Sequence, residues 1–362
     1  MSHVQEQHIL DALKQIIDPD LKKDIVTLGF VKNLTIDGTT VSFSIELTTP
    51  ACPVKEQFRQ QAQTLVSALD GVETVNVEMT AQVQGGKQAT ELLPHVKNVI
   101  AVASGKGGVG KSTTAVNLAL ALSRMGASVG IMDADIYGPS LPRMLNITER
   151  PNPDEVGEKG KGVEPIMAHG LKAISMGLFV PEEAPMVWRG PMVGMAVEQL
   201  LRDIEWGELD YLIIDLPPGT GDAQLTLTQK VPLTGVVIIS TPQDVALLDV
   251  KKGINMFKKV NAPVLGVVEN MSYYLCPDCG HRAEIFSHGG ARKQAEADGI
   301  EFLGELPLDE KICKDADSGN PTMVSDPDGL QGKRYQEIAS KIAAKVATLR
   351  HNEQAFPKIV VE

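Results

Sequence analysis

The sequence predicts an α/β protein in which a small α+β unit precedes a doubly wound, mainly parallel sheet. From Asn98 onward, short apolar runs of strand length alternate with helix-like stretches. Most of these runs are apolar at nearly every position, which is typical of a sheet covered on both faces. Before residue 84 the apolar residues instead recur at helical spacing or alternate with polar ones, which favours strands with helices on one face.

The apolar runs of the larger unit define its predicted strands. They lie at Val99–Ala103, Val129–Met132, Leu171–Ser175, Tyr211–Ile214, Val236–Ile239, Val264–Val268 and Phe302–Leu303. In doubly wound sheets ligands bind beyond the carboxyl ends of the strands. The residues that follow these runs are therefore the first place to look for a site.

The smaller unit contains two helical stripes and two alternating strands. They lie at Ile9–Ile17, Val41–Leu47, Val54–Leu69 and Val75–Met79. We expect a small α+β domain over residues 1–83, a linker over 84–95 and the large domain over 96–362. A Pro-, Gly- and charge-rich stretch, Pro151–Gly162, predicts a mobile loop. The amphipathic stretch Tyr335–Leu349 has a small, Ala-rich apolar side and predicts a helix packed on its domain.

Composition narrows the classes of partner. The chain has 362 residues and a net charge of -12, so it gains no general attraction to nucleic acid or to anionic lipid. Its apolar runs fall short of the ~20 residues that a membrane span needs, and residues 1–6, MSHVQE, do not resemble a signal peptide. We expect no nucleic-acid or membrane partner and a cytoplasmic location, where thiols stay reduced.

A phosphate-binding loop follows the first strand of the larger unit. The pattern G-x-x-x-x-G-K-[ST] is met by Gly105, Lys106, Gly107, Gly108, Val109, Gly110, Lys111, Ser112 and Thr113. An apolar helix follows it, so strand, loop and helix come in the order that a P-loop requires. The glycines let backbone N–H groups converge on phosphate, Lys111 reaches the β and γ phosphates, and Ser112 ligates Mg²⁺. The alternative is a glycine-rich turn that binds nothing.

Two acidic segments follow other predicted strands. Asp133 and Asp135 come directly after Val129–Met132, and Asp215 follows Tyr211–Ile214 and opens a Pro-Pro-Gly-Thr-Gly-Asp segment. Carboxylates at strand ends are where a metal–phosphate site needs them. Each taken alone can equally be a helix cap, and the combination with the P-loop favours a magnesium nucleotide site.

A Cys-x-x-Cys pair, Cys276 and Cys279, follows the strand Val264–Val268. Its spacing lets both thiolates bind one metal centre. One pair leaves coordination positions unfilled, and two copies of the chain on a two-fold axis supply four sulfurs for a [4Fe–4S] cluster or for zinc. A zinc knuckle with His281 or His288, a redox dithiol and an inert pair are the alternatives.

Lys106 makes the loop resemble the deviant Walker A motif of the MinD, ParA and nitrogenase-reductase group. The resemblance implies that ATP lies between two subunits and that Lys106 reaches the partner's nucleotide. It further implies Asp133 near Mg²⁺, Asp135 orienting the attacking water and Asp215 bound to Mg²⁺ through water. Asn270 matches the position that recognises adenine, with the region of Pro307 as a weaker second contact.

The order of these motifs resembles the Mrp/ApbC family of iron–sulfur cluster carriers over roughly residues 95 to 350. The resemblance implies a homodimer that binds ATP and Mg²⁺, has weak ATPase activity and carries a [4Fe–4S] cluster. It also implies that iron–sulfur assembly scaffold proteins and apo iron–sulfur proteins are partners. A MinD/ParA-like surface-positioning ATPase, an electron-transferring reductase and a zinc-stapled ATPase without a cluster are the competing functions.

The remaining cysteines lie apart from the pair. Asp18-Pro19-Asp20 and the run around Cys52 resemble the small domain found in iron–sulfur assembly proteins. Cys52 precedes a predicted helix whose dipole would lower its pKa, which makes it a possible cluster-handling thiol; the alternative is a buried small apolar residue. Cys313 matches no motif and is expected to be structural.

Overall fold

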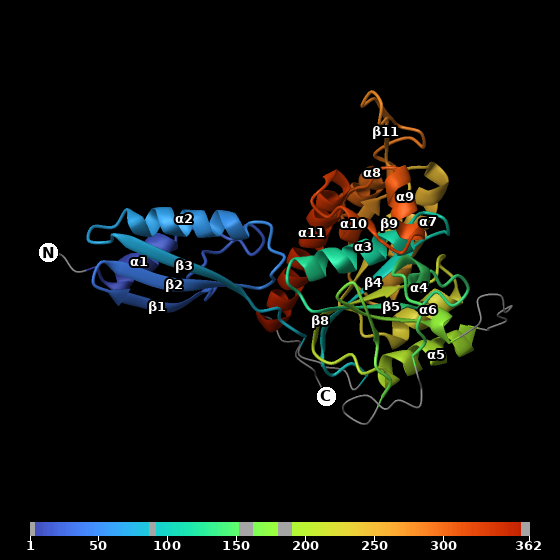
Figure 1. The fold of residues 1–362 in the computed structure, drawn as a ribbon, viewed down its shortest axis with the longest axis horizontal. Helices are drawn as coiled ribbons and strands as arrows, with labels where there is room; N and C mark the ends of the chain where they lie inside the picture. Colours follow the sequence, from blue (N-terminus) through green and yellow to red (C-terminus); the bar gives the residue numbers. More distant parts are fainter. Residues whose placement is uncertain (1–3, 87–91, 152–161, 180–189, 356–362) are drawn as a thin grey trace. The chain divides into compact units, whose positions relative to one another are not determined.

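We describe a computed structural model of the chain at residues 4–86, 92–151, 162–179 and 190–355 (Figure 1). Internal contacts divide it into two units, Met1–Gln84 with Ala343–Glu362, and Gly85–Ile342, and each is described by itself. The break after Gln84 falls beside the start of the predicted linker. The assignment of 96–362 to one domain stays a prediction, because the last turns of the C-terminal helix group with the smaller unit. The predicted loop Pro151–Gly162 lies almost wholly outside the described residues.

The smaller unit is a three-stranded sheet with two helices on one face (Figure 1). Its elements are α1 (Glu6–Leu13), β1 (Val31–Asp37), β2 (Thr40–Leu47), α2 (Lys55–Ser67) and β3 (Thr74–Ala81). The central strand β2 pairs antiparallel with β1 and parallel with β3. Val41, Phe43 and Ile45 alternate on one side of β2 and pack with Phe58 and Leu13 of the helices, so the predicted one-sided packing is confirmed.

The larger unit contains an eight-stranded sheet in the order β13-β10-β9-β4-β8-β5-β7-β6. Its strands are β4 (Val96–Ser104), β5 (Val129–Asp133), β6 (Ile166–Ala168), β7 (Leu171–Ser175), β8 (Leu209–Asp215), β9 (Gly235–Ser240), β10 (Val264–Glu269) and β13 (Phe302–Glu305). All pairings are parallel except that of the edge strand β6 with β7. Each predicted apolar run lies within one of these strands, which confirms the predicted doubly wound fold class.

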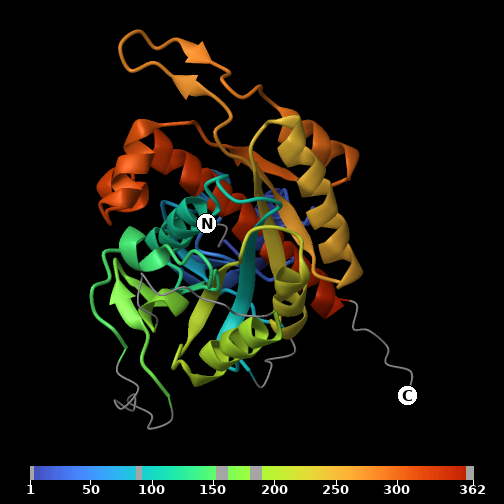
Figure 2. The same cartoon turned by 90° about the vertical axis from the view of Figure 1, so that its right-hand side faces the viewer.

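Helices cover both faces of this sheet (Figure 2). They are α3 (Lys111–Arg124), α4 (Leu141–Met144), the 3₁₀ turn η1 (Met176–Leu178), α5 (Gly190–Asp203), α6 (Asp222–Lys230), α7 (Asp244–Lys259), α8 (Gly290–Ala297), α9 (Glu310–Asp317), α10 (Thr322–Ser325) and α11 (Leu330–Ala355). Helices α5 to α8 share one core with the sheet, whereas α3 contacts β4, β5 and β8 from the other face. The part of α11 in this unit buries Tyr335, Ile338 and Ile342, as the amphipathic pattern predicts.

A small hairpin leaves the sheet after β10 and projects from the body of the larger unit (Figures 1 and 2). It consists of β11 (Tyr274–Leu275) and β12 (Arg282–Ala283), paired antiparallel. Among the described helices, none combines the length and the apolar character needed to cross a membrane.

Close strand packing predicts a strong effect for one glycine. A Cβ on Gly266 of β10 would lie 2.5 Å from Leu303 Cγ and 2.8 Å from the Glu301 carbonyl oxygen. We expect Gly266→Ala to destabilise the larger unit by about 1–3 kcal/mol, because the backbone cannot move aside as a side chain can. Urea unfolding followed by the fluorescence of the buried Trp206 measures this. Gly138→Ala is the matched control, since nothing lies within 4 Å of the added Cβ; equal losses would contradict the prediction.

Candidate functional site

The glycine-rich loop joins β4 to α3 at the carboxyl end of the sheet. Gly108 and Gly110 have φ of 75° and 77°, in the left-handed region that glycine adopts without a Cβ penalty. Gly105 passes so close to α7 that a Cβ would lie 2.7 Å from the backbone carbon of Asp249. The loop therefore depends on glycine at these positions, and it presents its N–H groups at the start of α3 as an anion site requires.

Lys111 is buried and paired in this loop. Its ammonium group lies 2.5 Å from Asp215 Oδ1, 3.2 Å from the Ser112 hydroxyl and 3.7 Å from Asp135 Oδ2. The predicted residues Lys111, Ser112, Asp135 and Asp215 thus lie together. Burial raises the pKa of Asp215, and the positive charge of Lys111 opposes that shift without cancelling it.

Two carboxylate oxygens at this place lack partners. Asp135 Oδ1 and Asp215 Oδ2 are buried and accept no hydrogen bond among the described residues. A buried acceptor without a donor is costly unless a cation or a water-bound metal satisfies it. Oxygen ligands are those that Mg²⁺ prefers, so Asp215 and the Ser112 hydroxyl fit a magnesium ion bound with nucleotide phosphates, and the unpartnered Asp135 oxygen fits a water molecule beside it.

Asp133 holds the segment that follows β5. Its Oδ1 accepts the Asp135 N–H at 3.0 Å, and its Oδ2 accepts the Ser140 N–H at 3.0 Å, the Leu141 N–H at 3.2 Å and the Ser175 hydroxyl at 3.1 Å. Complete burial and the negative charge of Asp215 raise the pKa of Asp133 to about 7. Both oxygens are occupied in this geometry, so the structure gives Asp133 a positioning role. That Asp133 lies near Mg²⁺ stays a prediction.

Other predicted nucleotide residues surround the loop. The Asn270 amide donates to the Val109 carbonyl at 2.8 Å, which places Asn270 against the P-loop; its contact with adenine stays a prediction. The Gly219 N–H donates to the Ser104 carbonyl at 2.9 Å and ties the segment after β8 to β4. Lys106 is half-buried, and it forms no ion pair among the described residues. Its reach into a partner subunit is likewise untested.

The two thiols lie in the tight turn of the β11–β12 hairpin. The Cys276 N–H donates to the His281 carbonyl at 2.9 Å, and the Gly280 N–H donates to the Cys276 carbonyl at 2.8 Å. Hydrogen bonds from the backbone N–H groups of Cys279 and Asp278, and then from the Cys279 thiol, lower the pKa of Cys276. Cys279 is exposed and Cys276 is half-buried, so both sulfurs lie together where a soft metal can reach them.

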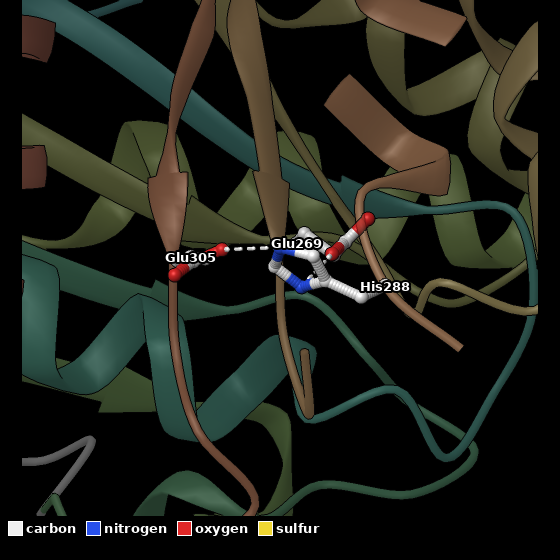
Figure 3. Close-up of side chains that lie close together, drawn as sticks. All are labelled: Glu269, His288 and Glu305. Atoms are coloured by element: carbon white, nitrogen blue, oxygen red, sulfur yellow. Dashed lines mark ion pairs between the residues drawn. The ribbon is translucent and has the colours of Figure 1, made fainter. Parts of the chain in front are cut away.

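The Cys pair gains no third ligand from its own chain in the described part of the structure. There, Glu269, His288 and Glu305 form the single group of three His, Cys, Asp or Glu side chains with metal-ligand spacing (Figure 3). His288 faces Glu269 and Glu305 and His281 is exposed, so the zinc knuckle with either histidine gains no support from these side-chain positions. One chain therefore offers two sulfurs at this place, and their completion by a second copy stays a prediction.

Comparison with known proteins decides the assignment. A family model described as the NUBPL iron-transfer P-loop NTPase matches residues 95–343. The chain belongs to this family.

Relatives of this iron-transfer P-loop NTPase match it over most of their length. The iron–sulfur cluster carrier protein of Synechocystis sp. is 45% identical over 94% of the chain and 97% of the relative. The Escherichia coli (strain K12) protein of the same name is 44% identical, over 91% and 89%. The iron–sulfur cluster transfer protein NUBPL of Dictyostelium discoideum is 51% identical, over 71% and 79%. An iron–sulfur cluster assembly protein model also matches residues 6–79.

Solved structures agree with this P-loop NTPase fold. An Archaeoglobus fulgidus nucleotide-binding protein in complex with ADP has a TM-score of 0.56 and 38% identity, and covers 64% of this chain and 93% of its own. The cell division ATPase MinD of Pyrococcus furiosus has a TM-score of 0.50 at 19% identity, over 68% and 98%, which is a likeness of fold alone.

One expectation about the other cysteines is wrong. Burial raises the pKa of Cys52 to about 11, and the charges of Asp18 and Asp20 add to the shift, so the predicted lowering by the helix dipole is outweighed. Its thiol is a poor nucleophile near neutral pH. Cys313 is exposed on α9, with its sulfur 3.9 Å from Asp317 Oδ2, and its expected structural role stays a prediction.

The sequence reasoning missed Glu269 and Ser272, and it named His288 only as an alternative zinc ligand. Glu269 ends β10 one residue before Asn270, and it is fully buried with both carboxylate oxygens bonded. A charged residue closing an apolar strand is a signal that is available in sequence. Its partners come from distant segments, so the network itself is visible only in the fold.

The buried ion pair predicts a pH-dependent loss of stability. Lys111→Met leaves Asp215 buried and unpaired, which costs about 3–5 kcal/mol while the carboxylate is charged. Without Lys111 the pKa of Asp215 rises further, so the stability of the variant falls as pH rises toward that pKa. Its loss of stability relative to wild type is therefore larger near pH 8 than near pH 5.5, which is about one unit above the range of ordinary carboxyls. Thermal melts at both pH values measure it, with Lys106→Met on the same loop as control. An equal loss at both pH values would contradict the role given to Asp215.

The opposed pKa shifts predict an order of thiol reactivity. Cys276 has a lowered pKa and Cys52 a pKa of about 11, and the thiolate is the reacting form. In the reduced, metal-free protein near neutral pH, iodoacetamide should modify Cys276 before Cys52 by at least roughly tenfold. Peptide mass spectrometry over time measures both in one sample. Faster labelling of Cys52 would show that burial does not protect that thiol.

Proposed function

We propose that the chain is an iron–sulfur cluster carrier with an ATP site. It binds a [4Fe–4S] cluster between the Cys276 and Cys279 pairs of two subunits and transfers it to apo-proteins. The observation that carries the proposal is the exposed two-thiol hairpin, which has no third ligand group in the described chain. The names of the relatives support the cargo, since cluster carrier and cluster transfer proteins match most of this chain.

The half site favours a homodimer. Thiolates are soft ligands and suit iron–sulfur clusters, which take four cysteines. A two-fold axis through the cargo brings two copies of each thiol together without any further residue. An exposed cargo is also one that an acceptor protein can reach, so the same arrangement serves both holding and transfer.

ATP and Mg²⁺ complete the proposal at the P-loop. The loop and Lys111 would bind the phosphates, and Ser112 and Asp215 would hold Mg²⁺. Asp133, predicted to lie near the ion, would hold the segment that carries Asp135. When bound, the ion neutralises charge that develops on the phosphates. Asp135 orients the attacking water, and Lys106 reaches the partner's nucleotide. We propose weak ATPase activity in the cytoplasm, with assembly scaffold proteins as cluster donors.

The competing functions differ in a specific feature. A surface-positioning ATPase of the MinD kind shares the fold, but it gives no role to the thiol hairpin. A zinc-stapled ATPase uses the same four sulfurs of a dimer, and metal content separates it from the carrier. The N-terminal unit matches an iron–sulfur assembly model, and we propose that it docks partners, since the raised pKa of Cys52 disfavours cluster handling by that thiol.

Anaerobic reconstitution tests the proposal. The reduced protein is incubated with ferrous iron and sulfide, desalted, and analysed for iron, sulfide, visible absorbance and mass in solution. We expect a coloured dimer with roughly four irons and four sulfides per two subunits. Cys276→Ala/Cys279→Ala should lose both iron and sulfide, whereas Cys313→Ala, which removes an exposed cysteine outside the hairpin, should retain them. A colourless protein with about one zinc per dimer would instead favour the zinc-stapled ATPase.

A further inference from the structure

A polar network lies at the root of the thiol hairpin (Figure 3). The Ser272 hydroxyl donates to Glu269 Oε1 at 2.6 Å and lies 2.9 Å from His288 Nδ1. A hydroxyl has one proton, and Ser272 gives it to Glu269, so His288 Nδ1 must be the donor in the second bond. The chain of bonds runs from the returning end of the hairpin, His288, to the end of β10.

Glu269 anchors this network to the body of the larger unit. It is fully buried, its Oε1 also accepts the Gly289 N–H at 2.9 Å, and its Oε2 accepts the Ala291 N–H at 2.7 Å at the start of α8. On the other side, Arg282 of β12 lies 3.9 Å above the Tyr273 ring and 3.3 Å from Glu305 Oε1. Both strands of the hairpin are therefore fixed at their base.

The geometry favours a closed hydrogen-bond network over a metal site. The Ser272 hydroxyl lies 2.6 Å from Glu269, 2.9 Å from His288 and 3.3 Å from Glu305, so it occupies the place between the three side chains. The Arg282 guanidinium adds a positive charge beside Glu305. Both features oppose a cation there.

The same short segment contacts the P-loop. Asn270, two residues before Ser272, donates to the Val109 carbonyl, and a Cβ on Gly110 would lie 2.2 Å from its amide nitrogen. Between them, Met271 has a φ of 54°, an uncommon conformation for a side chain of its size. The backbone of Ser272 is bonded to Leu306. Because these contacts are tight, a movement of Val109 or Gly110 on phosphate binding is expected to move Asn270 and, through the two following residues, Ser272.

We propose that Ser272 is a positioning residue that couples the nucleotide site to the thiol hairpin. Nucleotide in the P-loop displaces Asn270, the displacement changes how Ser272 holds His288, and the hairpin with Cys276 and Cys279 responds. The proposal rests on the two sites of the proposed function and adds the residues that connect them. Coupling between two binding sites is reciprocal. The factor by which nucleotide changes the affinity of the thiols for cargo is therefore the factor by which cargo changes nucleotide affinity.

Thiol alkylation tests this coupling without needing a cluster. The full-length, reduced, metal-free protein is treated with iodoacetamide alone, with Mg·ADP and with Mg·ATP, and each cysteine is followed by peptide mass spectrometry. We expect nucleotide to change the Cys276 rate by about fivefold or more, the lower end of typical couplings. The exposed Cys313 is the internal reference and should keep its rate.

Variants identify the path. In Ser272→Ala and His288→Ala, the Cys276 labelling rates with and without nucleotide should become nearly equal, so that their ratio is close to one. Calorimetry should show that both variants still bind nucleotide. His288→Asn places an amide N–H near the position of Nδ1 and should restore the ratio. Ser287→Ala, which removes an exposed hydroxyl from the neighbouring residue, should leave it unchanged.

The outcomes separate this proposal from the proposed function. A wild-type ratio of one in protein that binds nucleotide, or an unchanged ratio in both Ser272→Ala and His288→Ala, overturns the coupling even if the cluster binds. A nucleotide-dependent ratio that these variants abolish supports it even if reconstitution yields no cluster. If the wild-type chain binds neither Mg·ADP nor Mg·ATP, both the coupling and the proposed ATP site are overturned.

Discussion

The Lys111 ammonium and the Asp215 carboxylate meet at 2.5 Å where β8 ends beside the P-loop. Both groups are buried, so each is stable there because the other is present. Asp215 takes its place from the central position of β8 between β4 and β5, and Lys111 from the first turn of α3. The sheet order thus brings the charge pair together, and the arrangement of the phosphate loop, Asp135 and the segment held by Asp133 follows from it.

The thiol site obeys the opposite constraint. Its hairpin strands are two residues long, and its sulfurs lie outside the apolar core. The hairpin has little apolar packing, and hydrogen bonds at its root hold it in place instead. There Ser272 and His288 connect it to the buried Glu269. A rigid root with exposed ligands allows the cargo site to be reached without opening the sheet, and Asn270, just before that root, contacts the P-loop.

Much of this organisation is predictable from the sequence because parallel strands buried on both faces leave continuous apolar runs, and the residues after them carry the chemistry. The P-loop, Asp135, Asp215 and the Cys pair were placed in this way. The edge strand β6 is too short to leave such a run. The role of Asp133 and the pKa of Cys52 depend on burial and neighbours that no local pattern encodes. The Ser272 network joins residues 16 and 33 positions apart, which only the folded chain reveals.

The placement of the hairpin outside the core separates folding from loading. In small zinc-binding domains the metal supplies the free energy of folding, so the empty domain unfolds and the site is lost with its ion. Here the sheet and its helices form a core to which Cys276 and Cys279 contribute nothing. The empty chain therefore keeps its fold, and one molecule can pass through many rounds of filling and emptying without refolding between them.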